Sequence, residues 1–126
     1  MNKLPAILAV LVLFQGCLLF EGGSAYPDTD IVEPAGFELK LAHDIVKANG
    51  MIRSGTLEYA GAGELVKAYR EWAEDMHYRG WIGGTDEMTS QKATCLFRKD
   101  GRVCEVLFTS ASGAIKVSMK VKPTSD

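Results

Sequence analysis

The chain has 126 residues, which is enough for one domain and too few for two. Hydrophobic residues make up 47% of it, so we expect a packed core and exclude an intrinsically disordered protein. The formal net charge of −2 leaves no basic excess, and we therefore expect no nucleic-acid partner.

The N-terminus has the pattern of a secretory signal. Lys3 supplies one positive charge, and an uninterrupted apolar run follows at residues 6–14. An apolar core of about 7–15 residues behind a positive charge is typical of such signals. We therefore predict that the protein is exported and lies in the cell envelope or the periplasm.

Cys17 is the candidate lipid-attachment residue. It follows Gly16, and a small residue before a cysteine suits cleavage by the lipoprotein peptidase. On this interpretation residues 1–16 are removed and the Cys17 thiol carries a diacylglyceryl group. The predicted partners are then the membrane, through an N-terminal acyl anchor, and an envelope protein that the sequence does not identify.

Two other ways of processing the signal stay open. Gly23 and Ala25 are small residues at the positions that signal peptidase I prefers, so cleavage could instead remove residues 1–25 and leave no anchor. Alternatively, nothing is cleaved, although residues 4–20 are at the short limit of a membrane span. Of the three alternatives, the lipoprotein is favoured.

The first half of the exported part predicts a tether, a hairpin and a helix. Residues 26–34 are polar with two prolines and are interpreted as a tether or an irregular lead-in that could carry a short strand at Ile31 and Val32, so the domain would span residues 35–126. Alternation on both sides of an Asn-Gly pair predicts a β-hairpin over residues 37–60. Residues 64–77 carry one apolar stripe at helical spacing, and Gly80 is a natural stop after it.

The second half predicts short strands. A strand begins at Trp81 and is expected to end or bend at Gly83 and Gly84, before a polar loop. Alternating runs at residues 93–98, 103–108 and 115–122 follow, joined by glycine-containing turns. The order β-β-α-β-β-β predicts the α+β class, with a single helix packed on one face of an antiparallel sheet.

The last predicted strand carries three lysines on its polar side. Lys116, Lys120 and Lys122 alternate with apolar residues. Lysines often protect an edge strand from pairing with other chains, and this pattern predicts that the last strand lies at an edge of the sheet.

Cys95 and Cys104 flank the turn at Asp100 and Gly101, on the same predicted face of a hairpin. In an oxidising compartment they could form a disulfide, although diagonal neighbours at about 7–8 Å are somewhat far apart for one. The alternative is a pair of small buried residues with free thiols.

The sequence offers few candidates for a chemical site. His43 and His77 lack further ligands at metal-binding spacing, so we predict no metal site and no cofactor. Trp72 and Trp81 could line a pocket between the helix and the sheet, but their positions favour a role in the core. We expect no catalytic residues.

Several short motifs together resemble a set of small, uncharacterised exported bacterial domains, many of them predicted lipoproteins. The shared pattern includes Pro-Ala-Gly-Phe at residues 34–37, Gly-Thr-Leu-Glu-Tyr-Ala-Gly at 55–61, Gly-Trp at 80–81 and the run from Leu96 to Cys104. The resemblance implies a helix packed on an antiparallel sheet and carries no activity or site residue. Members often have an aliphatic residue in place of Cys95.

Two hypotheses for function follow. The first is an exported, lipid-anchored envelope protein that binds a partner or assists assembly without catalysis. The second is a small periplasmic or secreted ligand carrier or enzyme, with a pocket between helix and sheet near Trp81.

Overall fold

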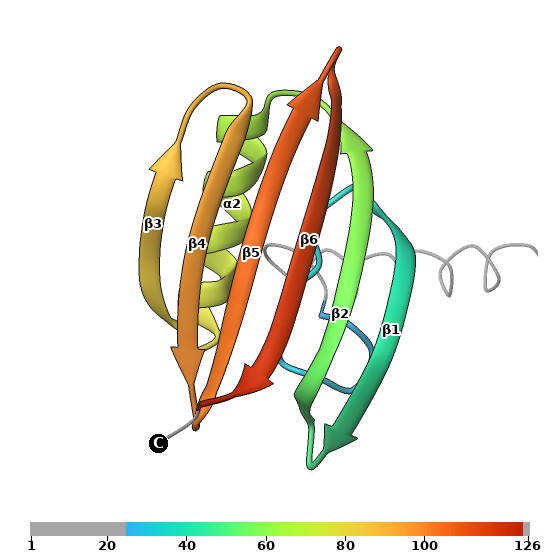
Figure 1. Cartoon of the computed structure of the whole chain (residues 1–126), viewed down its shortest axis with the longest axis vertical. Helices are drawn as coiled ribbons and strands as arrows, with labels where there is room; N and C mark the ends of the chain where they lie inside the picture. The colour runs from blue at the N-terminus through green and yellow to red at the C-terminus, as the bar shows by residue number, and fades with distance from the viewer. Residues whose placement is uncertain (1–24, 125–126) are drawn as a thin grey trace, which may run out of the picture.

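A computed structural model describes residues 25–124 of the chain. One helix and six strands follow one another in that part (Figure 1). Their bounds are β1 (Glu38–Ala48), β2 (Met51–Ala62), α2 (Leu65–Tyr78), β3 (Ile82–Met88), β4 (Lys92–Lys99), β5 (Arg102–Ala111) and β6 (Ala114–Pro123).

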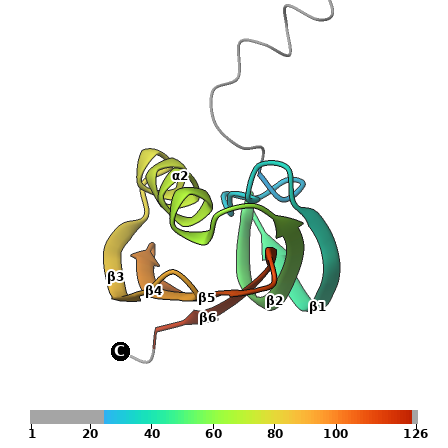
Figure 2. The same cartoon turned by 90° about the horizontal axis from the view of Figure 1, so that it is seen from above.

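All six strands form one antiparallel sheet in the order β1-β2-β6-β5-β4-β3. The helix lies against one face of the sheet, over β3, β4 and β5 (Figure 2). The predicted α+β class, with one helix packed on an antiparallel sheet, is therefore confirmed. The predicted order β-β-α-β-β-β is observed with one further strand after the helix. The predicted edge position of the last strand is wrong, because β6 lies between β2 and β5 near the centre of the sheet.

Two tight turns of the same kind form where the sequence places them. Asn49 and Gly50 join β1 to β2 with φ angles of 54° and 77°. Asp100 and Gly101 join β4 to β5 with φ angles of 51° and 74°. Asparagine, aspartate and glycine tolerate such positive φ angles better than other residues, so these pairs fix the hairpins.

The helix α2 follows its apolar stripe. Its buried residues Leu65, Tyr69, Trp72 and Met76 fall at helical spacing and face the sheet. Gly80 has a φ of 97° just beyond the helix end, a conformation that glycine adopts without strain. The predicted helix agrees with the observed one to within a residue at each end.

Strand β3 continues further than the sequence indicates. Its glycines neither end nor break it, because β3 stays paired with β4 as far as Met88. Gly83 allows a close approach of the two backbones: a Cβ there would collide with the carbonyl oxygen of Leu96. A single register shift between Thr85 and Glu87 then leads into the last pairs.

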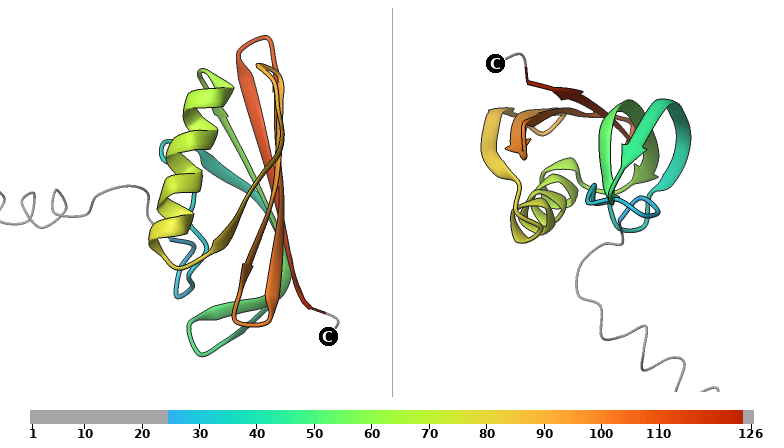
Figure 3. Two further views of the ribbon diagram at one scale, coloured as in Figure 1. Left: turned by 90° about the vertical axis from the view of Figure 1, so that its left-hand side faces the viewer. Right: turned by 90° about the horizontal axis from the view of Figure 1, so that it is seen from below.

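Residues 25–37, which we call the N-terminal strap, are part of the domain. Ile31 and Val32 in the strap are completely buried, and the strap lies beside α2 on the same face of the sheet (Figure 3). Burial of these two apolar side chains outweighs the polar character of their neighbours. The prediction of a tether over residues 26–34 is therefore wrong, and the domain begins before residue 35.

Candidate functional site

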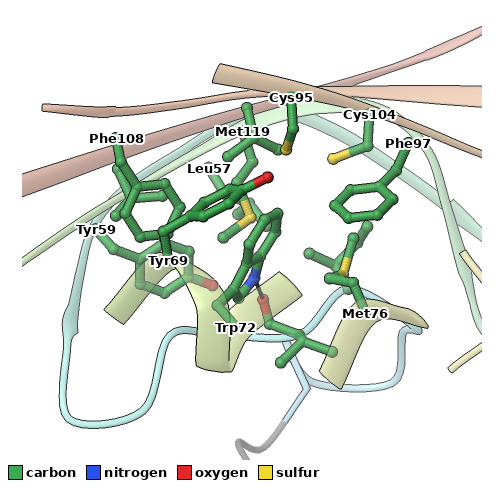
Figure 4. Close-up of a cluster of buried hydrophobic side chains, with 14 of the residues drawn as sticks. Leu57, Tyr59, Tyr69, Trp72, Met76, Cys95, Phe97, Cys104, Phe108 and Met119 are labelled. Carbon is green, nitrogen blue, oxygen red and sulfur yellow. Dashed lines mark hydrogen bonds between the residues drawn. The ribbon is translucent and has the colours of Figure 1, made fainter. Parts of the chain in front are cut away.

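The two tryptophans that could have lined a pocket lie in the core. Trp72 is 2% exposed and Trp81 is 1% exposed. The Trp72 ring packs between Phe97, Phe108 and Tyr69, with ring centroids 5.5–6.1 Å apart (Figure 4). This aromatic cluster fills the space between α2 and the sheet.

Each tryptophan also fixes the N-terminal strap. The indole Nε1 of Trp72 donates a hydrogen bond of 2.8 Å to the carbonyl oxygen of Val32. The indole of Trp81 donates one of 3.0 Å to the carbonyl oxygen of Asp30. Both tryptophans therefore satisfy polar backbone groups of a segment that has little regular structure of its own.

A small hollow remains between the strap and the first turns of α2. Its volume is about 220 Å³, and Trp72 lies at its wall together with Phe37 and Glu71. Pockets for small molecules usually measure about 300–1,000 Å³. Trp81 does not line this hollow, so the structure does not bring the two predicted pocket residues together.

A charged cluster that sequence reasoning missed lies at one end of the core. Arg102 is 1% exposed, and its Nη1 and Nη2 donate hydrogen bonds of 3.2 and 2.8 Å to the two carboxylate oxygens of Asp30. Nη1 also donates to the carbonyl oxygen of Ile52 at 3.0 Å. Lys99 donates to Asp30 at 2.9 Å and to the carbonyl oxygen of Arg79 at 2.7 Å. We call Asp30, Lys99 and Arg102 the Asp30 cluster.

The electrostatics of the Asp30 cluster favour the charged carboxylate. Burial alone would raise the pKa of Asp30, but hydrogen bonds and charge from Arg102 and Lys99 hold that pKa below its ordinary value. The guanidinium carbon of Arg102 lies 4.7 Å from the centre of the Trp81 ring. The Nε of Arg102 is buried without a hydrogen-bond partner. The guanidinium group that contains it lies over the face of the Trp81 ring.

The Asp30 cluster links two parts of the fold. Asp30 comes from the strap, whereas Lys99 and Arg102 flank the β4–β5 turn, so the cluster joins the strap to the sheet. The sequence contained one signal for it. Arg102 falls in the same alternation as Cys104 and Val106, which places its side chain on the buried face.

Cys95 and Cys104 are free thiols in the structure, both buried. Cys95 pairs with Val106 and Phe97 with Cys104, so the cysteines are diagonal neighbours, as the two-residue turn requires. The disulfide considered above is therefore not formed, and the alternative of two small buried residues applies. Burial raises the pKa of Cys95 to about 11 and also raises that of Cys104, so neither is a thiolate nucleophile.

The histidines make local contacts. His43 lies 3.0 Å from the carboxylate of its exposed neighbour Asp44. His77, in the last turn of α2, contacts the carbonyl oxygen of Gly83 through Nε2 at 3.0 Å. Within residues 25–124, no group of three or more His, Cys, Asp or Glu side chains is placed to hold a metal ion.

The face of the sheet away from the helix, which we call the outer face, is open to solvent. It carries Lys116 and Lys120 on β6 and the 38%-exposed Leu107 on β5. Two shallow hollows of about 480 and 420 Å³ meet there and share Leu107 and Ser118. Lys122 pairs with Glu105 at 2.8 Å, and these lysines thus belong to a central strand with an exposed polar side.

One edge of the sheet combines an unpaired backbone with exposed apolar side chains. Strand β3 is the last strand on its side, and its residues are exposed from Ile82 to Glu87. Ile82 is 75% exposed, and Tyr78, four residues earlier at the end of α2, is 91% exposed. These are the two most exposed of the large hydrophobic side chains in the described part of the chain.

Cys17 and both predicted cleavage sites lie outside or at the start of the described residues. Among the helices of residues 25–124, none has the length and apolar character needed to cross a membrane. No protein-family model, no curated protein and no solved structure matches this chain.

Proposed function

We propose that this protein is an exported, lipid-anchored component of the cell envelope whose domain binds or helps to assemble other envelope components without catalysing a reaction. The observation that carries the proposal is the closed interior. Aromatic side chains fill the space between helix and sheet, so a ligand or partner would have to bind on the outside.

The anchoring part of the proposal rests on the signal sequence and on Cys17 after Gly16. The position of the strap is compatible with it. The chain joins the domain through the strap on the helix side, and the outer face is on the opposite side (Figure 3). A domain anchored through Cys17 would keep both the outer face and the edge of β3 available to a partner.

The second candidate, a ligand carrier or enzyme with a pocket between helix and sheet, has less support. The hollow beside Trp72 has a volume of about 220 Å³ and is too small for most ligands. The buried thiols have raised pKa values and the half-buried carboxylate of Asp30 is already paired, so the interior offers no activated group.

Chemical crosslinking in intact cells tests the proposed function. We expect the wild-type protein to crosslink to a membrane or envelope component, and the Cys17→Ser variant to lose that crosslink while it remains folded. Recovery of the wild-type protein alone, over a range of crosslinker lengths, would contradict the binding role. An equal crosslink in both proteins would retain the binding role and remove the anchor from it.

A further inference from the structure

We propose that the free edge of β3 is a docking site for an extended segment of a partner protein, which would add to the sheet as a further strand. This inference deepens the proposed binding function, because it names the surface and the chemistry of the partner. It does not require that Cys17 is acylated.

The unpaired backbone of β3 determines what kind of group can cover it. β3 hydrogen-bonds to β4 on one side only, so the N–H and C=O groups on its other side have no strand partner. A second extended backbone is the structure that satisfies a row of such groups. The occupant is therefore a strand.

The edge formed by β1 is protected against the addition of a strand, whereas the edge formed by β3 is largely unprotected. β1 has register shifts at three places and a positive φ of 56° at Asp44, and it carries Lys40 and Lys47. Bulges and lysines are the usual means of preventing strand addition. The first half of β3, from Ile82 to Thr85, has no register shift, lysine or proline, although His77 Nε2 contacts the carbonyl oxygen of Gly83 there at 3.0 Å.

Side chains near the two ends of β3 indicate which residues a partner segment would need. At the start, the exposed Ile82 offers apolar surface, and the exposed Tyr78 ends α2 four residues earlier in the chain. Near the other end, the exposed Asp86 forms no ion pair within residues 25–124, whereas Glu87 lies 3.5 Å from Lys92. An extended segment with apolar side chains at one end and a basic one at the other would match this edge.

Gly84 supplies a variant that blocks the edge with little effect on the fold. Its φ is not positive, and a Cβ built there meets no atom within 4 Å. We therefore expect Gly84→Lys to fold and to place a charge beside the edge. Leu41→Lys is the matched control, since Leu41 is 42% exposed on β1 at the guarded edge.

The test is amide hydrogen exchange of β3 in the exported chain starting at residue 17, with Cys17→Ser. The probe is a synthetic hexapeptide of alternating valine and threonine with a lysine at one end, and a second peptide carries the lysine at the other end. We expect hydrogen exchange to slow about tenfold at the β3 amides that point away from β4, when about nine-tenths of the protein has peptide bound at the edge. Methylation of every second peptide nitrogen and Gly84→Lys should each abolish this protection, and Leu41→Lys should retain it.

Three results would overturn the proposal. The first is no protection of β3 by either peptide at millimolar concentration. The second is a response confined to the outer face around Leu107. The third is protection of β3 that rises with protein concentration in the absence of peptide, which would assign the edge to a second copy of the chain. None of these results bears on the acylation of Cys17, so the two proposals fail separately.

Discussion

At the scale of single residues, the Asp30 cluster is the contact in which charge and burial act most strongly together. Arg102 is almost completely buried, and two of its nitrogens are satisfied by Asp30. A buried ion pair adds modestly to stability when it is intact, but loss of one partner leaves an uncompensated charge in the core. Asp30 should therefore be far more sensitive to substitution than exposed carboxylates of the helix.

We predict that Asp30→Ala lowers the free energy of unfolding by about 3–5 kcal/mol, because it removes the nearest carboxylate partner of the buried Arg102 and leaves only Asp100, at 4.0 Å, within ion-pair distance. Urea denaturation of the two proteins measures the difference. Glu71→Ala is the control, since Glu71 pairs with Lys67 on the exposed face of α2 and should show little change. Equal losses in the two variants would show that the Asp30 cluster has no special role.

The pKa of Asp30 predicts how this contribution depends on pH. In the folded protein the pKa lies below the ordinary value of 3.8. The stabilisation is therefore complete above the unfolded pKa and is lost as the pH falls through the folded pKa. The stability difference between wild type and Asp30→Asn should stay constant near neutrality and shrink below about pH 4. A difference that remains constant down to about pH 2 would contradict this assignment.

The buried cysteines predict a pattern of thiol reactivity. In the Cys17→Ser background, Cys95 and Cys104 should resist alkylation in the native protein, because they are buried and their pKa values are raised. Both should react as soon as the protein is denatured, without a reductant. Mass spectrometry counts the alkyl groups. Labelling that appears only after reduction would demonstrate a disulfide.

At the scale of elements, the N-terminal strap explains how a short helix and a single sheet close their core. The helix covers β3 to β5, and the strap covers part of the face that the helix leaves open. Hydrogen bonds from Trp72 and Trp81, together with the Asp30 cluster, hold the strap in place. The segment that would lead to the anchor is thus fixed firmly to the domain.

We predict that Ile31→Ala costs about 2–5 kcal/mol of unfolding free energy, since Ile31 is completely buried in the strap. Ile82→Ala is the matched control on the exposed edge of β3 and should cost less than about 1 kcal/mol. Thermal or urea unfolding compares the two substitutions. A small cost for Ile31→Ala would mean that the strap is loosely attached.

Local sequence signals predicted the elements that depend on local chemistry. The Asn-Gly and Asp-Gly turns require positive φ angles, and the apolar stripe of α2 has helical spacing, so both could be found from the chain alone. The extent of β3 could not, because its glycines read as a break. Pairing with β4 overrides that preference and depends on residues elsewhere in the chain.

The strap and the strand order were missed for a related reason. Ile31 and Val32 are two apolar residues among polar ones, and only the presence of Trp72, Trp81 and Arg102 across the fold makes their burial favourable. The lysines of β6 resemble the protection of an edge strand, but the position of a strand in the sheet is not encoded by its own residues. The crossover through α2 places β3 at one edge and leaves β6 between β2 and β5.

At the scale of the whole molecule, a closed interior contrasts with an accessible exterior. The core contains aromatic rings, two free thiols and, at one end, the Asp30 cluster. The exterior offers the outer face and the free edge of β3. On the proposed function the molecule acts by binding, and its location in the cell determines which partners are available to it.

Cys17 is the residue on which that location depends, so the intact mass of the protein extracted from membranes is the most direct test. We predict a wild-type chain that begins at Cys17 and carries the mass of a lipid, and a Cys17→Ser variant without that mass. A mature chain that begins at Tyr26 in both proteins would contradict the anchored account and indicate a secreted domain without an anchor.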